Sequence, residues 1–323
     1  MRLPRPGLFE LVAAAFLAAT AVMAVQSAHA WIGQDFTIFS VAGKTMLSGA
    51  WRHTYDHAEV QAGPLQLGLC AILRRLFGAY GTSLALVSDL LVAAMLVAAV
   101  RSFVGRRAAA LAFAGAVAVT VGLVMHPYTT GHFAEPVVGV LWMVAAREAR
   151  RGRVLAAGAI VGLSSGFELW GILGISVLAL APRWRDAAKG VAVAGATFTL
   201  LLGPFVAGGD FHMFAFTWHV TGGPLSLVLP GMAFGWPLRL LQSAIVLGIA
   251  VPFARRVRGL GAAVFLVPAA TAIVRLSIDP MGTFYYWDAP LVIELVGAAA
   301  ALSQLDAIRA WAAMRLGRLA PTV

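Results

Sequence analysis

The chain has 323 residues, of which 60% are hydrophobic and only 12% are charged, and its mean hydropathy is +0.85. A soluble domain carries about twice this charged fraction. Long apolar runs recur along the whole chain. The composition therefore excludes a soluble globular protein and predicts an all-α polytopic membrane protein. The net charge of +10 comes from short basic clusters between the apolar runs, which is typical of cytoplasmic loops and argues against a nucleic-acid partner.

About ten apolar segments can be interpreted as transmembrane helices. We expect them at residues 8–28, 81–100, 108–126, 134–147, 154–167, 169–182, 190–207, 237–254, 259–277 and 288–304. Basic clusters fall at alternate junctions between them, which predicts that both termini lie in the cytoplasm. We therefore expect a single integral membrane domain over residues 1–323, multi-pass in a bacterial plasma membrane.

The first apolar segment has some features of a signal peptide. An Ala-His-Ala sequence at residues 28–30 resembles a cleavage site. The apolar run at residues 8–25 is nevertheless long for a signal peptide, so we expect it to be retained as the first helix. Both interpretations predict that the chain is extracytoplasmic from Trp31 onward.

All seven histidines lie between the predicted spans, on the side opposite the basic clusters. They are His29, His53, His57, His126, His132, His212 and His219. Acidic and aromatic residues accompany them in the outer segments 29–80, 126–135, the turn at Glu168, 208–236 and 278–288. The extracytoplasmic face is therefore the face on which we expect chemistry.

The first extracytoplasmic loop, residues 29–80, is predicted to contain two helices that lie at the membrane interface. Residues 35–49 have apolar residues on one face, Asp35 at the start and Gly49 at the end. Residues 64–79 are too short and too charged to cross the membrane and are amphipathic. Asp35 could simply cap the first of these helices, or it could have a chemical role.

This loop resembles the first extracytoplasmic loop of GT-C glycosyltransferases, and most closely that of bacterial polyprenyl-phosphate-mannose-dependent mannosyltransferases. The residues that carry the resemblance are Asp35, Phe36, Phe39, Ala42, Leu47, Gly49, Tyr55 and Pro64. A weaker similarity covers residues 162–163 and 182–185. The chain departs from the family pattern in having Gly63 before Pro64, where many members have a second proline. It also has Glu168 near a break at which many members have a basic residue.

The resemblance implies a GT-C-like fold and an inverting transfer of a hexose, mannose in the nearest relatives. The donor would be a polyprenyl-phosphate-linked sugar in the membrane lipid, and the acceptor a lipid or glycan of the cell envelope. In this family the acid that opens the loop is the catalytic base, which assigns that role to Asp35. An ionised carboxylate near the interface is a competent base. No cofactor and no metal is required by this mechanism.

Further residues are candidates for substrate binding because they are polar or aromatic and lie in the outer segments. They are His53, Tyr55, Asp56, His57, Gln61, His126, Tyr128, His132, Glu135, Glu168, His219, Arg275 and Tyr285. For the second loop, sugar binding competes with a hydrogen-bonded turn and with a metal site that would use His126, His132 and Glu135. The spacing of the two histidines has no helical register, and no third ligand is obvious. Glu135 could also cap a helix.

Three other candidates have plain structural alternatives. Arg275 suits a donor phosphate, but it could instead pair with Asp279. His219 lies in an aromatic stripe that is typical of an interfacial belt. Glu168 interrupts an apolar stretch and could be functional or structural. A transporter or lipid-binding protein without catalysis, and a degenerate partner subunit with the same scaffold, remain alternatives for the whole chain.

Overall fold

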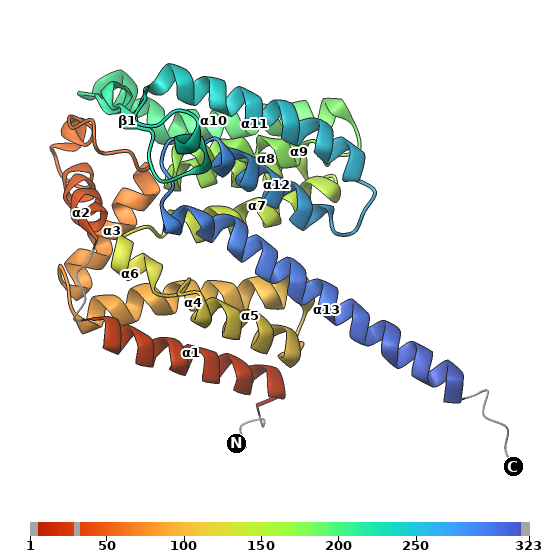
Figure 1. Ribbon diagram of the computed structural model, residues 1–323. Helices are drawn as coiled ribbons and strands as arrows, with labels where there is room; N and C mark the ends of the chain where they lie inside the picture. Colours follow the sequence, from red (N-terminus) through yellow and green to blue (C-terminus); the bar gives the residue numbers. More distant parts are fainter. Residues whose placement is uncertain (1–5, 29–32, 318–323) are drawn as a thin grey trace, which may run out of the picture.

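The computed structural model describes residues 6–28 and 33–317, with side chains described as far as Leu305, and it is almost entirely helical (Figure 1). The α-helices are α1 Leu8–Ser27, α2 Gln34–Met46, α3 Pro64–Phe77, α4 Thr82–Val104, α5 Ala108–Thr120, α6 His126–Thr130, α7 Ala134–Arg150, α8 Val154–Phe167, α9 Ile175–Leu178, α10 Trp184–Gly208, α11 Trp236–Val257, α12 Ala263–Ser277 and α13 Asp288–Gly317. The short 3-10 helices are η1 Trp51–His53, η2 Leu169–Gly174, η3 Met213–Ala215, η4 Pro224–Leu227 and η5 Phe284–Trp287. Strands β1 (Trp218–His219) and β2 (Ala233–Phe234) form a small antiparallel pair. The all-α prediction is confirmed apart from this hairpin.

Fewer helices than the ten predicted spans have the full length and apolar composition of a membrane span. Within the described residues, five helices are long and apolar enough: Leu8–Ser27, Thr82–Val104, Trp184–Gly208, Trp236–Val257 and Phe284–Leu305. Helices α5, α8 and α12 have only 13, 14 and 15 residues, or about 20–23 Å of the roughly 30 Å hydrocarbon core. The predicted span 169–182 is divided between η2 and α9. The protein is therefore a multi-pass membrane protein with about five candidate spans by length and composition, and the count of ten stays a prediction.

The helices form two packed groups that meet along α7 and α13. In one group α1, α4, α5 and α13 share a core that includes Phe9, Phe16, Leu96 and Leu111. In the other, α7 to α12 enclose a core rich in alanine and valine. Figure 1 shows α13 leaving the bundle toward the C-terminus, and α2 and α3 together at one end of the molecule.

Helices α2 and α3 are the two that were predicted for the first loop. They pack against one another through a buried face that contains Phe39 and Leu67. Helix α2 ends at Met46 and not at Gly49, because the Ser48 hydroxyl bonds the Thr45 carbonyl and accepts from the Ala50 N–H. Helix α3 begins at Pro64, whose missing N–H costs nothing in the first turn. His29, one of the seven histidines, lies outside the described residues.

Candidate functional site

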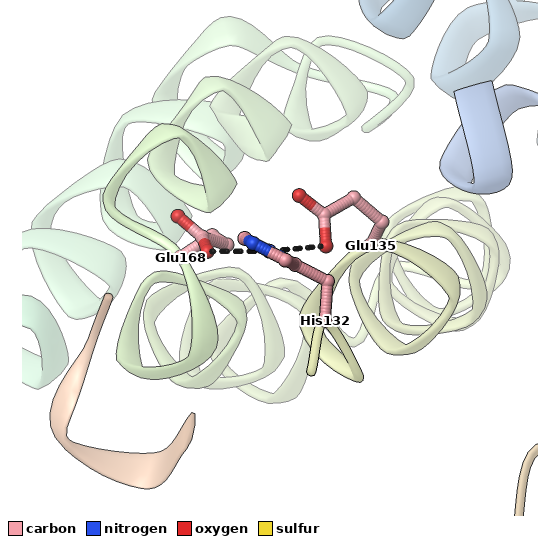
Figure 2. Close-up of side chains that lie close together, drawn as sticks. All are labelled: His132, Glu135 and Glu168. Atoms are coloured by element: carbon pink, nitrogen blue, oxygen red, sulfur yellow. Dashed lines mark ion pairs between the residues drawn. The ribbon is translucent and has the colours of Figure 1, made fainter. Parts of the chain in front are cut away.

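Three buried ionisable side chains from separate segments meet inside the molecule. His132 lies in the short link between α6 and α7, Glu135 lies in the first turn of α7, and Glu168 lies between α8 and η2. Nδ1 of His132 is 3.4 Å from Oε2 of Glu135 and 3.9 Å from Oε1 of Glu168. Figure 2 shows the imidazole between the two carboxylates. All three residues were candidates from the sequence.

Asp35 lies on the opposite edge of the same imidazole. Nε2 of His132 is 2.8 Å from Oδ2 of Asp35, and the Tyr285 hydroxyl lies 3.5 Å from the same oxygen. The Tyr285 ring stacks on the His132 ring with centroids 4.2 Å apart. The Asp35 side chain is 40% exposed, so it joins the buried cluster to the surface.

The helix-capping alternatives for the two acids do not hold in the described residues. Helix α2 begins after Gly33 and α7 begins after Phe133, and neither start carries a side-chain capping hydrogen bond. Asp35 is engaged with His132, and Glu135 points toward the same ring. Both carboxylates therefore belong to the cluster.

Two glycines allow the first loop to approach the second closely enough for Asp35 to reach His132. Gly131 has a φ of +84°, and a Cβ there would lie 2.4 Å from the backbone nitrogen of Phe36. A Cβ on Gly33 would lie 2.5 Å from the carbonyl oxygen of Thr130. At Gly131 only glycine tolerates both the left-handed conformation and the close contact, and at Gly33 only glycine leaves room for the contact. The amide of Gln66 donates to the Gly131 carbonyl at 2.8 Å and fixes the turn from the α3 side.

Glu168 is held by the first loop in a similar way. The chain leaves α8 at Phe167, and Glu168 adopts an extended conformation that forms an isolated β-bridge with Ala62. The Gly63 N–H donates to the Phe167 carbonyl at 2.9 Å. A Cβ on Gly63 would lie 2.3 Å from the Gly166 carbonyl oxygen. The break that the sequence predicted at residues 164–168 is therefore a turn that aims one carboxylate at His132.

The cluster has more negative than positive groups in a buried place. Burial lowers the pKa of His132, but the charge of Glu135, the hydrogen bond to Asp35 and the charge of Glu168 together raise it to about 10. Burial raises the pKa of Glu168, and the Glu135 charge raises it further against the opposing effect of His132 and Arg275. The raised pKa values favour a protonated His132 and a neutral Glu168, and both states reduce the excess negative charge.

A cavity of about 450 Å³ opens beside His132 and Glu168. Its walls are mainly apolar and aromatic: Phe39, Leu169, Trp170, Ile172, Leu173, Phe198, Phe214, Trp218, Trp236, Pro237 and Leu240. Polar groups come from Gln61, His132, Glu168, Arg239, Gln242, Ser243, Arg275 and Tyr286. Asp35 does not line this cavity, and its side chain is exposed at the protein surface instead. The mainly apolar lining with two arginines suits a ligand that has an apolar part and an anionic head.

Two arginines of the cavity wall are joined by one buried carboxylate. Oδ2 of Asp279 is 3.1 Å from Nη2 of Arg275 and 2.9 Å from Nη1 of Arg239. The Arg275–Asp279 pair that the sequence left as an alternative is therefore present, and Arg275 still lines the cavity. Its guanidinium lies 4.3 Å from the Trp170 ring centroid. Two cations on one anion leave one positive charge uncompensated at this wall.

Arg239 and Gln242 also line the cavity, although neither was predicted from the sequence. Gln242 accepts from Arg239 at 3.0 Å and donates to backbone carbonyls at Arg275 and Ile278. Arg239 lies just inside the predicted span 237–254, and a cation inside a span is itself a signal of a functional or paired group. That signal could have identified it.

Several predicted binding residues lie apart from the cluster. His53 pairs with Asp210 at 2.8 Å, and His57 is 3.7 Å from Asp56, all on the exposed surface. His219 is exposed on β1. His126 is 2.8 Å from Asp288 and so does not join His132 and Glu135 in the metal site that the sequence considered.

Two predicted tyrosines have structural contacts instead. Tyr55 is buried, and its hydroxyl donates to the Ala62 carbonyl. Tyr128 is also buried, donates to the Ala28 carbonyl and accepts from the Gly81 N–H. Gln61, by contrast, reaches the cavity wall. The site that the structure assembles therefore contains Asp35, His132, Glu135, Glu168, Tyr285, Arg275 and Gln61 from the predicted set.

No protein-family model and no curated protein matches the chain by sequence. The structure is similar to the crystal structure of ArnT from Cupriavidus metallidurans in the apo state, with a TM-score of 0.56 and 21% sequence identity. The chain therefore shares the fold of that protein over most of its own length. The superposition covers 94% of this chain but 62% of the ArnT chain. This chain therefore spans less than two thirds of the length of ArnT, and the likeness concerns the fold alone.

Proposed function

We propose that the protein is a GT-C-type glycosyltransferase of the bacterial plasma membrane that works on the extracytoplasmic face. It moves a hexose, mannose according to the first-loop resemblance, from a polyprenyl-phosphate donor to a lipid or glycan acceptor of the cell envelope. The similarity of fold to ArnT, a GT-C membrane glycosyltransferase, supports the reaction class. The observation that carries the proposal is the half-exposed Asp35 held by His132 beside the apolar cavity.

Asp35 acts as the general base in this proposal. The acceptor hydroxyl attacks the anomeric carbon of the donor sugar, the bond from that carbon to the phosphate oxygen breaks, and the hydroxyl proton passes to Asp35. The configuration inverts, and polyprenyl phosphate leaves. Hydrogen bonds from His132 and Tyr285 to Oδ2 orient the carboxylate. Its 40% exposure leaves access for the acceptor from outside the cavity.

The cavity would bind the donor. A guanidinium matches the geometry of a phosphate and can contact it through two N–H groups. Arg275 and Arg239 lie at the polar part of the wall, where Asp279 neutralises only one of the two charges. Trp170, Trp218 and the other aromatic walls would then hold the first part of the polyprenyl chain. The phosphate charge that develops during transfer would be stabilised by these arginines.

The reaction class can be tested with purified protein in proteoliposomes. Radiolabelled polyprenyl-phosphate hexoses would be supplied together with lipid and glycan acceptors extracted from bacterial envelopes. We expect label to move to an acceptor with release of one polyprenyl phosphate per sugar transferred, and mannose to be the best donor sugar.

Heat-treated protein provides the blank, and Glu148→Gln provides a matched variant far from the cluster. Glu148 lies at the other end of α7, where it pairs with Arg151 and Arg153. Movement of donor across the bilayer without cleavage would contradict the proposal and favour a transporter. Absence of both activities with all donors would favour a non-catalytic partner subunit.

A further inference from the structure

The cluster contains buried polar atoms that have no hydrogen-bond partner of acceptable geometry among the described residues. They include Nδ1 of His132 and both carboxylate oxygens of Glu135. Glu135 is completely buried, and His132 is 5% exposed. One imidazole cannot balance two buried carboxylates, and a buried carboxylate left without a cation costs several kcal/mol or more. A side chain of this kind is retained where it pairs with a cation.

The three side chains have the spacing of a small coordination sphere. One donor atom each from His132, Glu135 and Glu168 can be chosen so that all three lie within 4.8 Å of one another. Ligands about 2.1 Å from a tetrahedral ion lie about 3.4 Å apart. The separation of Nδ1 of His132 and Oε2 of Glu135 is already 3.4 Å, and that of Nδ1 and Oε1 of Glu168 is 3.9 Å. A small side-chain movement would complete the geometry.

The imidazole is also oriented as a metal ligand would be. Ligating histidines generally donate their other ring N–H to a carboxylate, a backbone carbonyl or a water, which fixes the tautomer and makes the ligand more basic. Nε2 of His132 has such a partner in Oδ2 of Asp35 at 2.8 Å. That contact leaves Nδ1, with its lone pair, directed at Glu135 and Glu168.

We propose that His132, Glu135 and Glu168 bind one divalent transition-metal ion, with Zn²⁺ favoured over Mn²⁺. One nitrogen and two carboxylate oxygens form a donor set that suits Zn²⁺, and an open fourth position is available for water or a substrate oxygen. Zn²⁺ binds nitrogen and oxygen donors more tightly than Mn²⁺. Three side-chain donors are too few for Ca²⁺, which takes six to eight oxygens.

The charge balance favours a cation at this position. Asp35, Glu135 and Glu168 surround a single imidazole, and Arg275 and Arg239 with Asp279 add only one net positive charge nearby. A dication between the two glutamates neutralises both. The metal set that the sequence considered contained His126, but His126 pairs with Asp288, and Glu168 supplies the missing third ligand from a segment 33 positions beyond Glu135.

The inference is tested by metal content and affinity, which require neither donor nor acceptor and therefore do not depend on the proposed function. The full chain is purified in detergent, stripped with EDTA, dialysed and titrated with Zn²⁺, Mn²⁺, Mg²⁺ and Ca²⁺ by calorimetry. We expect one Zn²⁺ per chain, weaker Mn²⁺, and no binding of Mg²⁺ or Ca²⁺ at matched concentration.

Glu135→Gln and Glu168→Gln are each expected to weaken Zn²⁺ binding at least about tenfold, since even losing a partner that only orients a ligand has an effect of this size. Glu148→Gln, on the same helix as Glu135, should bind like the unaltered chain. Circular dichroism and gel filtration monitor the fold of each variant. Equal Zn²⁺ affinity in all three variants would overturn the proposal.

A second measurement uses the unaltered chain alone, so it does not depend on a variant that folds. Co²⁺ added to the stripped protein should give a visible absorption band of four- or five-coordinate geometry, and Zn²⁺ should displace it. Absence of the band, together with no Zn²⁺ retained after dialysis, would overturn the site and favour an imidazolium ion held between carboxylates.

Discussion

Nε2 of His132 lies 2.8 Å from Oδ2 of Asp35, although the two residues are 97 positions apart in the chain. This contact joins the start of α2 to the link between α6 and α7. Through His132, the partly exposed carboxylate of Asp35 is connected to the buried carboxylates of Glu135 and Glu168. The geometry of the proposed base therefore depends on how closely the two loops approach.

Gly131→Ala should loosen that approach. The φ of +84° and the 2.4 Å separation between a Cβ and the Phe36 nitrogen both oppose a side chain at this position. We expect a loss of about 1–3 kcal/mol in unfolding free energy and a lower melting temperature. Gly248→Ala is the control, because Gly248 lies in α11 with no atom within 4 Å of the added carbon. That substitution should be neutral or slightly stabilising. Equal effects of the two substitutions would contradict the close-approach argument.

Arg275→Gln tests the proposed phosphate site. The substitution removes one guanidinium from the cavity wall while Arg239 continues to pair with Asp279. Hydrogen bonds to charged groups contribute about 1.5–3 kcal/mol, so the KM for the polyprenyl-phosphate donor should rise about 10- to 100-fold. Arg275→Lys should recover only part of this, because an ammonium cannot make the two-pronged contact. A rise confined to the KM for the acceptor would contradict the assignment of Arg275 to the donor phosphate.

Tyr285→Phe tests the contribution of the Tyr285 hydroxyl separately from that of its ring. The hydroxyl is 3.5 Å from Oδ2 of Asp35, whereas the ring stacks on His132. Loss of the hydroxyl alone should lower kcat about two- to tenfold, which corresponds to one weak hydrogen bond. Tyr285→Ala, which also removes the stacking partner, should reduce kcat further. Identical rates for the two variants would mean that the ring does not position His132.

The predicted sidedness can be measured with single cysteines. In a Cys70→Ala background, Ser48→Cys and Arg153→Cys would each be treated in intact cells with a membrane-impermeant maleimide. Both positions are exposed, and Cys70 itself is buried. We expect Ser48→Cys to react and Arg153→Cys to react only after the cells are opened. The reverse pattern would invert the topology and move the cluster to the cytoplasmic face.

Several residues of the cluster could be selected from sequence because each was an acid, a histidine or a cation in a segment between apolar runs. Asp35 opens the loop that carries the family resemblance, and Glu168 interrupts an apolar stretch. The local helices α2 and α3 followed from the spacing of their apolar residues and from Pro64. Residue type and the spacing of neighbouring apolar residues are local properties of the chain, so they can be read from a single sequence.

Partners distant in the chain could not be predicted in the same way. Nothing in the sequence around His126 indicates that it pairs with Asp288 and not with Glu135. The bridge between Ala62 and Glu168 depends on the packing of α3 against α8. Ten spans were predicted but only five described helices have the length and apolar composition of a span, because hydropathy alone does not separate a short buried helix from one that crosses a membrane.

Asp35→Asn tests the central claim most directly, by comparing its rate of sugar transfer with that of the unaltered chain at equal amounts of inserted protein. Asparagine keeps the size of the side chain and an oxygen acceptor for His132, but it cannot take a proton. We predict that the rate falls about 10²- to 10⁴-fold, while the protein still inserts and keeps its melting temperature within a few degrees. A transfer rate within a few-fold of the unaltered chain would contradict the assignment of Asp35 as the base.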